Sequence, residues 1–340
     1  MKRIVPLLLA LALLFTGCTV PAGEGSSSVP SQGESSLASQ EESSSTGEES
    51  ASDTDTAIGI TDSNGSQITL DTSAPRVVAA YGSFAEAWLL AGGELCGVTQ
   101  DALEQRDLGL PEDIAVVGTV KEPNAEEIIA LEPDLVLLAS DITAQADIRD
   151  VLENAGLACA FFQVDTFADY AFMMEQLCAI TGREDLYEEN VTQVGQQIEE
   201  AQANAALSST RPNVLLIRAF STGIKAKTDD ELAGAILKDL GAHNIADDHP
   251  SMLEDLSLEE VIAADPDYIF VTTMGDEQKA LDYLNGLIQQ NPAWSELSAV
   301  KEDRYIVLPK DLFHYKPNNR WGESYQYLGE ILYPQLFHEE

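Results

Sequence analysis

The sequence predicts an α/β protein of two lobes with mainly parallel sheets, joined by a single long α-helix and holding a ligand cleft between the lobes. Short apolar runs alternate with helical segments, which is typical of parallel sheets covered on both faces. The alternation stops once, at a polar segment over residues 183–208 with apolar positions at helical spacing. It then restarts, and a phrase of the first half returns: "NAEEIIALEPDLVLL" begins at Asn124 and "SLEEVIAADPDYIFV" at Ser257.

The first 56 residues are predicted to lie outside both lobes. Lys2 and Arg3 precede an apolar run that is too short to cross a bilayer, so residues 1–17 are predicted to be a signal peptide. The stretch that ends at Cys18 resembles a bacterial lipobox, which implies a lipidated cysteine; an ordinary cleaved signal with a chance cysteine is the alternative. Residues 18–56 are rich in Ser, Gly and Glu and are predicted to be a disordered acidic leash.

Charge and cysteine content narrow the class of protein. The net charge of −40 becomes −42 once Lys2 and Arg3 are removed, which argues against nucleic acid as a partner. Beyond the lipobox, Cys96, Cys159 and Cys178 are too few and too scattered for a disulfide framework. We expect them to be small buried residues, with a Cys159–Cys178 bridge as the alternative.

The first lobe is predicted over residues 57–182. A β-hairpin over residues 58–70 turns on Asn64-Gly65. Ser83 is expected to cap the first helix, and Asn124 the helix that Pro133 stops, with Glu127 completing a capping box. The expected strands are residues 76–81, 95–99, 114–118, 134–140 and 158–163, and the other helices are residues 144–154 and 167–180.

The second lobe is predicted over residues 209–340, after the linking helix. Its expected strands are residues 213–219, 267–273 and 304–309. Its expected helices are residues 230–240, 258–264, 277–290 and 320–332. The repeated phrase falls at the same place in each half: a capped helix, a proline stop and a central strand.

Three stretches resemble a known family. They are "ITDSNGSQITLDTSAPRVVAAYGSFAEAWLLAGGELCGVT", "NAEEIIALEPDLVLL" and "NPAWSELSAVKEDRYIVLP". In this order they resemble the class III substrate-binding proteins of bacterial ABC importers, the group that serves ferric siderophores, haem and cobalamin. The resemblance covers the chain after the leash. It implies a monomeric, lipid-anchored binding protein on the extracytoplasmic face of the cell membrane, which delivers its ligand to an ABC permease dimer and, through it, to an ATPase.

The resemblance also assigns a docking role to one glutamate in each lobe. Glu126 and Glu259 match the family's permease-docking positions. Each lies in the first turn of a predicted helix, where the helix dipole favours a carboxylate that a permease Arg could bind. The alternative is that Glu126, Glu127, Glu259 and Glu260 all cap and solvate helix starts, and we favour it for Glu127 and Glu260.

The ligand-binding candidates follow the predicted strands, because ligands of open α/β sheets bind beyond the carboxyl ends of the strands. In the first lobe they are Tyr81, Ser83, Lys121 and Asp141. In the second lobe they are Arg218, Phe220, Met274, His314, Tyr315, Arg320 and Trp321.

Positive residues carry most information in so acidic a chain. The whole sequence has 18 Lys and Arg and four His, yet the segment that follows the last strand gathers Lys310, His314, Lys316 and Arg320. They favour an anionic ligand held by charge-assisted hydrogen bonds and aromatic packing. Arg218 at the end of an apolar strand needs a partner, which a ligand could supply.

Alternative roles remain for several candidates. Lys310 and Lys316 can be solvated loop residues, and His314 can be a metal or iron ligand or a hydrogen-bonded loop residue. Tyr81 and Trp321 are expected to be cleft aromatics rather than core residues.

The sequence favours a ferric siderophore as the ligand, with haem, cobalamin or an oxyanion as alternatives. No catalytic motif is recognisable, so we expect no enzyme, no catalytic residue and no cofactor, and no metal site of the protein's own. An exported α/β enzyme or a sensor lipoprotein is the alternative class. The long helix is expected to limit the motion of the lobes to a modest tilt.

Overall fold

The computed structural model describes residues 57–254 and 256–337. The signal peptide, Cys18 and the acidic leash therefore lie outside the described residues. In the described part of the chain, no helix is both long and apolar enough to span a bilayer.

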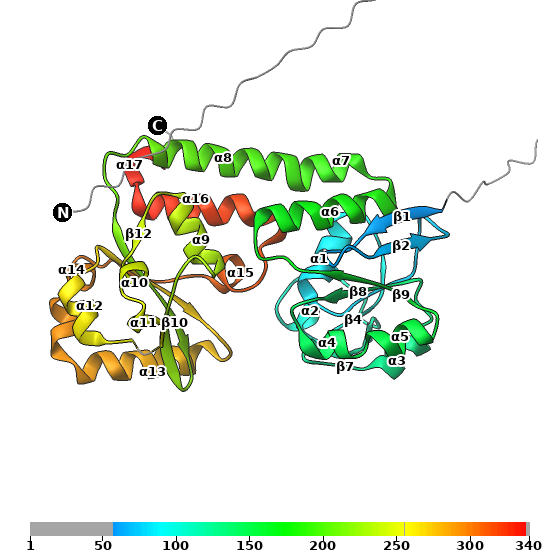
Figure 1. The fold of residues 1–340 in the computed structure, drawn as a ribbon, viewed down its shortest axis with the longest axis horizontal. Coiled ribbons are helices and arrows are strands. Elements are labelled where there is room, and N and C mark those ends of the chain that lie inside the picture. The colour runs from blue at the N-terminus through cyan, green and yellow to red at the C-terminus, as the bar shows by residue number, and fades with distance from the viewer. Residues whose placement is uncertain (1–56, 255, 338–340) are drawn as a thin grey trace, which may run out of the picture. The chain divides into compact units, whose positions relative to one another are not determined.

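The first lobe is built on a five-stranded parallel sheet with strand order β5-β4-β3-β8-β9. Helices α1 (Gly82–Leu90) and α6 (Phe167–Thr181) cover one face, while α3 (Ala125–Ala130) and α5 (Arg149–Asn154) cover the other (Figure 1). The strands are β3 (Val77–Ala79), β4 (Leu95–Val98), β5 (Ala115–Val116), β8 (Leu135–Ala139) and β9 (Ala158–Phe162). Outside the sheet lie the hairpins β1 (Ile58–Thr61) with β2 (Gln67–Leu70) and β6 (Gly118–Thr119) with β7 (Glu122–Pro123), and the helices α2 (Asp101–Glu104) and α4 (Thr143–Asp147).

A helical run of three parts links the two sheets. It comprises α7 (Glu184–Tyr187), a π-helical turn η1 (Glu188–Thr192) and α8 (Gln193–Ala206). The prediction of one long helix is confirmed, with a π-turn that the sequence did not reveal. Buried Asn190 occupies this turn and donates from Nδ2 to the Leu186 carbonyl (3.0 Å) and the Leu90 carbonyl (3.3 Å), which ties the run to the end of α1.

The second lobe has a sheet in the order β11-β10-β13-β14, with β12 also pairing with β10. All pairs are parallel except β10 with β11, an antiparallel edge strand that the sequence did not predict. Its strands are β10 (Asn213–Phe220), β11 (Gly223–Lys227), β12 (His243–Asn244), β13 (Tyr268–Thr273) and β14 (Tyr305–Val307). Its helices are α9 (Leu232–Asp239), α10 (Ile245–Asp248), α11 (Ser251–Glu254), α12 (Leu258–Ala264), α13 (Glu277–Gln290), η2 (Pro292–Glu296), α14 (Ser298–Lys301), α15 (Lys310–Phe313), η3 (Asn318–Arg320), α16 (Trp321–Leu332) and α17 (Pro334–Phe337).

One apolar cluster extends through both lobes. Strand β10 shows how: Val214 and Leu216 face this cluster, while Leu215 and Ile217 face a second cluster with α13. The shared cluster continues through α8 and α16, which pack along each other, into α6 and the first sheet (Figure 1). Burial on both faces explains why the central strands are continuous apolar runs rather than alternating ones.

The repeated phrase builds the same local structure twice. Glu132 and Asp265 both adopt left-handed backbone conformations (φ 49° and 40°) directly before their prolines. The carboxylates of Asp134 and Asp267, directly after those prolines, accept from the backbone N–H of Arg76 (2.7 Å) and Asn213 (2.8 Å), at the start of the neighbouring strands. The Pro-Asp part of the repeat therefore ends a helix and aligns two strands, which is a packing role.

Several local predictions were wrong. Ser83 is not a cap: α1 begins at Gly82, and Ser83 is buried in its first turn. Glu127 does not complete a capping box, because the Asn124 N–H donates to the Val117 carbonyl instead. The helix expected over residues 144–154 is broken at Ile148 into α4 and α5. The three cysteines Cys96, Cys159 and Cys178 are free, so the alternative of a Cys159–Cys178 bridge is not realised.

Candidate functional site

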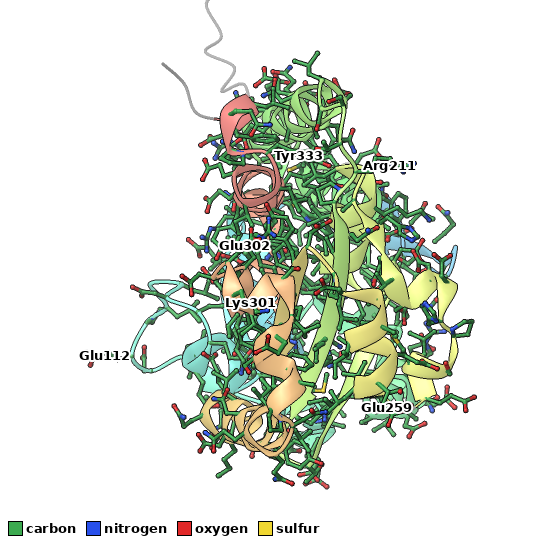
Figure 2. All side chains as sticks on the ribbon, turned by 90° about the vertical axis from the view of Figure 1, so that its left-hand side faces the viewer. Glu112, Arg211, Glu259, Lys301, Glu302 and Tyr333 are labelled. Atoms are coloured by element: carbon green, nitrogen blue, oxygen red, sulfur yellow. The ribbon has the colours of Figure 1, made fainter. Side chains whose placement is uncertain are left out.

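The two candidate docking glutamates occupy equivalent positions. Glu126 lies in the first turn of α3, where the Asn124 side chain accepts from its N–H (3.1 Å), and it is exposed. Glu259 is exposed in the first turn of α12, which Ser257 caps through the Glu260 N–H (3.3 Å) (Figure 2). Glu260 differs, since its carboxylate accepts from the Ser251 hydroxyl (3.0 Å). Each matched position thus carries an exposed glutamate at a capped helix start, while Glu260 is used within its own lobe.

The first-lobe candidates surround the start of α1. Tyr81 is half-buried, two residues beyond β3, and burial, followed by the charges of Asp101 and Asp141, raises the pKa of its phenol. Asp141 is exposed at the end of β8, and Lys121 is exposed in the turn between β6 and β7. The Ser83 hydroxyl accepts from Arg106 (2.8 Å).

A residue that sequence reasoning did not select organises this edge of the first sheet. Gln145 is fully buried, and its Oε1 accepts from the Ala139 N–H (2.7 Å). Its Nε2 donates to the carbonyls of Ala80 (2.7 Å) and Val120 (3.1 Å). One side chain thus joins the ends of β3 and β8 to the hairpin that carries Lys121. A glutamine in an otherwise ordinary helix start gives no sequence signal for this role.

In the second lobe, Arg218 already has protein partners. Its guanidinium forms an ion pair with Glu231, which also binds Lys227 (2.9 Å), and its Nε lies 3.5 Å from the Thr272 hydroxyl. Arg218 therefore has a charge partner without a ligand. Its side chain is only half-buried, so it remains accessible to solvent. Phe220 is half-buried at the end of β10, and Met274 is exposed after β13.

His314 and Tyr315 lie near the ends of the second sheet. Burial and then the charges of Arg218 and Lys310 lower the pKa of His314 to about 4, so its imidazole is neutral at physiological pH. The rings of His314 and Tyr315 are 5.3 Å apart. Burial and the nearby Glu277 raise the pKa of Tyr315, while Arg106 of the first lobe lowers it.

Arg106 connects the two groups of candidates. It lies after α2, forms an ion pair with Glu86 and donates to the Lys316 carbonyl (2.9 Å). Its charge reaches both Tyr81 and Tyr315. Arg106 is one of only 18 Lys and Arg in the sequence, and that rarity was the one signal that could have drawn attention to it.

Two predicted site residues are engaged elsewhere. Arg320 is held between Asp311 (2.7 Å) and Glu323 (2.7 Å), so its charge is already balanced. Trp321 is 2% exposed and packs edge-on against Phe167, which makes it a core residue rather than a cleft aromatic. The expectation of a cleft aromatic at Trp321 is therefore corrected. Lys316 is not a solvated loop residue either, since its ammonium binds the Val164 carbonyl and Asp165.

Comparisons with known proteins agree with this architecture. A family model described as periplasmic binding protein matches residues 77–312. A curated relative, the Fe(3+)-citrate-binding protein YfmC of Bacillus subtilis, is 26% identical over 262 residues, which is 74% of this chain and 78% of the relative.

Solved structures show the same fold. Staphylococcus aureus IsdE complexed with heme has a TM-score of 0.62 at 18% identity, covering 76% of this chain and 99% of that one. S. aureus SirA complexed with staphyloferrin B has a TM-score of 0.60 at 19% identity, covering 83% of this chain and 99% of that one. The predicted class of fold and the predicted family are confirmed. Because the family model spans more than half of the sequence, this chain belongs to the periplasmic binding protein family, whose members bind ligands for transport.

Proposed function

We propose that this protein is an extracytoplasmic solute-binding lipoprotein that captures an iron complex, a ferric siderophore or a chelate of similar charge, and delivers it to an ABC permease. Residues 1–17 act as the signal peptide, Cys18 as the lipidated residue and residues 18–56 as the leash. The ligand settles between a first lobe of residues 57–182 and a second lobe of residues 209–340, joined by the helix of residues 183–208. The protein works as a monomer and needs no cofactor.

The observation that carries the proposal is the group of side chains connected through Arg106. Tyr81 after β3 and Tyr315 after β14 both lie within reach of its charge, and His314 lies within reach of Arg218 and Lys310. Since the pKa values of both phenols are raised, both hydroxyls remain protonated and can donate hydrogen bonds to a ligand rich in acceptor oxygens. Cations at the same edge favour an anionic ligand.

Ferric citrate, haem and a ferric siderophore all meet this description, and the names of the similar proteins contain ligands of these kinds. Haem is the second candidate because the neutral, half-buried imidazole of His314 could serve as an axial ligand of its iron. Lys121, Asp141, Phe220 and Met274 complete the proposed site. Ser83 and Trp321 are left out because they are buried. Arg320 is left out because two carboxylates hold its guanidinium, whereas Arg218 shares its one carboxylate partner with Lys227.

A ligand panel tests the proposal. The full chain is titrated with ferric citrate, ferric hydroxamate and catecholate siderophores, haemin, cobalamin and molybdate, with quenching of tyrosine and tryptophan emission as the readout. We expect saturable binding of an anionic ferric complex. Binding of cobalamin or molybdate alone would contradict the iron assignment.

Two arginine variants locate the site. Arg218→Gln should weaken binding of the ferric complex by about tenfold, the value of one charge-assisted hydrogen bond. Arg320→Gln is the matched comparison, because it also removes one ion-paired, partly exposed arginine of the second lobe, and it should bind normally. Equal losses in the two variants would remove Arg218 from the site.

A further inference from the structure

Residues 316–319, beyond α15, carry three side chains that bind the first lobe and the linking run. The Lys316 ammonium binds the Val164 carbonyl and Asp165 (3.2 Å), and the Lys316 carbonyl accepts from Arg106 (2.9 Å). Buried Pro317 follows, and Asn318 and Asn319 donate to groups on α1 and on the π-turn η1. We call residues 316–319 the strap. It directly follows His314 and Tyr315, two residues of the proposed ligand site.

Asn318 is the most constrained member of the strap. Its side chain is fully buried, and its backbone is left-handed (φ 52°), a conformation that asparagine tolerates better than most residues. Its Nδ2 donates to the Ser83 carbonyl (2.9 Å) and to Glu86 Oε2 (2.6 Å). Both partners belong to the first two turns of α1, the helix that begins directly after Tyr81.

Arg106 completes a closed set of contacts around Glu86. It forms an ion pair with the same Oε2 atom that Asn318 binds, and its Nη2 donates to the Ser83 hydroxyl (2.8 Å) and the Lys316 carbonyl (2.9 Å). The carboxylate therefore accepts from a first-lobe cation and a strap amide together. Such a buried network holds its members in one arrangement, because breaking a single link leaves a buried polar group without a partner.

We infer that Arg106, Lys316 and Asn318 are positioning residues for ligand binding. They hold the strap against α1 and so fix the spacing between Tyr81 on the first lobe and Tyr315 on the second. The effect on ligand binding rests on the proposed function, whereas the attachment of the strap to α1 is a property of the protein alone. A ligand would then meet tyrosines already spaced for it, which lowers the ordering cost of binding and slows release.

Asn318→Asp tests the network with little change of shape. It replaces the amide donor by a carboxylate that faces two acceptors, the Ser83 carbonyl and Glu86. We expect amide hydrogen exchange in residues 314–321 and in the first turns of α1 to accelerate by about tenfold or more. Tryptophan emission should shift to the red, because Trp321 follows the strap and Trp88 lies in α1, whereas Trp294 is buried in the cluster between α13 and the second sheet.

A second change should restore the network. When Asn318→Asp is combined with Glu86→Gln, the introduced amide can turn its Nε2 towards the carboxylate on the strap and its Oε1 towards Arg106, although the carboxylate still faces the Ser83 carbonyl. The number of charges also returns to that of the native protein. Exchange and emission should then return towards native values.

The matched control is Asn291→Asp, which adds the same charge where the side-chain oxygen only accepts, from the Ala293 N–H (3.2 Å). It should change neither readout. Lys316→Met breaks the other link of the strap and keeps the aliphatic stem. It should therefore also accelerate exchange and shift the emission to the red, and it serves as the test if Asn318→Asp does not fold.

Stopped-flow binding of ferric citrate and haemin separates positioning from simple structural support. Asn318→Asp should raise the dissociation rate of the bound probe by about tenfold and change the association rate by less than about threefold. Unchanged dissociation with a loosened strap would overturn the positioning role. If the native protein binds neither probe, the proposed function loses support, and the exchange data alone decide. Native exchange in Asn318→Asp would then refute the strap.

Discussion

At the scale of single residues, the two arginines of the candidate site are ion-paired before any ligand arrives. Arg106 has Glu86 and Arg218 has Glu231, whereas Lys310 donates to the neutral Gly275 carbonyl (2.6 Å). A buried cation without a partner would be costly, and a chain of net charge −40 supplies carboxylates in excess. A ligand must therefore compete for, or share, arginines that the protein already positions.

His314 should make the stability of the protein depend on pH. Its pKa is about 4 in the folded protein, below the ordinary value of 6.5 that the unfolded chain retains, so the unfolded chain binds a proton more readily between these values. Its contribution to stability is complete above pH 6.5 and is lost as the pH falls towards 4. Since the ring is partly exposed, we expect about 1 kcal/mol rather than the full value.

Denaturant unfolding at pH 7.5 and pH 5 measures this effect. The native protein should lose more stability between the two pH values than His314→Gln, which has no imidazole to protonate. Carboxylates titrate in both proteins, so the comparison isolates the histidine. An equal loss of unfolding free energy in the two proteins would show that His314 protonates freely in the folded state.

The residue scale is also where sequence reasoning reached least far. Tyr81, Arg218 and His314 could be selected because the sequence predicts them at or after strand ends. The structure places Tyr81 just beyond β3 and Arg218 near the end of β10, while His314 ends α15, the helix that follows β14. The partners of Arg320, Asp311 and Glu323, lie near it in the sequence, so its ion pairs could have been foreseen. Trp321 could not be judged, because its partner Phe167 comes from a distant segment of the chain. Arg106, Gln145 and Asn318 were missed for the same reason: their contacts lie up to 235 positions away in the chain.

At the scale of elements, most helices and central strands could be predicted. Helices α12 and α13 begin and end at the predicted residues, because Ser257, Pro266 and the apolar period mark them plainly. Strand β11 could not be predicted, since "GIKAK" at the sheet edge contains two lysines and little apolar character. The π-turn η1 was also hidden, because its cause is the buried Asn190 rather than a helix breaker.

Two glycines inside helices should respond oppositely to alanine. A Cβ at Gly234 in α9 would lie 1.9 Å from the Thr228 carbonyl oxygen, which is backbone and cannot swing aside. Gly234→Ala should therefore destabilise the protein by about 2 kcal/mol or more. Gly286 in α13 has nothing within 4 Å of such a Cβ, so Gly286→Ala should stabilise by about 0.5–1 kcal/mol.

Thermal unfolding of the two variants checks this pair. A lower midpoint for Gly234→Ala and a higher one for Gly286→Ala are expected. Loss of stability in both would mean that helix propensity does not govern this position of α13.

The starts of α3 and α12 carry the docking prediction. Glu126 and Glu259 are exposed, while the caps Asn124 and Ser257 hold their helix starts in place. Reversing both glutamates to lysine should abolish uptake of the ligand in cells and leave its affinity for the purified protein unchanged. Glu199→Lys with Glu200→Lys, on the exposed side of α8, is the control for the added positive charge. Normal uptake by the variant with both docking glutamates reversed would contradict the docking role, and the repeat would then have a structural role only.

At the scale of the whole molecule, the shared apolar cluster has the largest consequence. Two sheets with separate cores could unfold independently. Here Val194, Ile198 and Ala201 of α8 join the cluster together with Tyr325 and Leu328 of α16. The cluster then reaches Leu177 of α6 on one side and Leu216 of β10 on the other, so the described lobes share buried surface instead of meeting only at a loop. This sharing, more than the length of the linking helix, favours small relative motions of the lobes.

We therefore expect residues 57–337 to unfold in one cooperative transition. Calorimetry of the full chain should give a single peak whose calorimetric and van't Hoff enthalpies agree, because neither sheet can lose its core without exposing that of the other.

Leu328→Ala removes a fully buried side chain where α16 meets the cluster and should cost about 2–5 kcal/mol. Leu284→Ala is the matched control, since Leu284 is equally buried but belongs to the cluster between α13 and the second sheet. Leu328→Ala should broaden or split the transition, whereas Leu284→Ala should only lower its midpoint. Two resolved peaks in the native protein would show that the lobes fold independently despite the shared cluster.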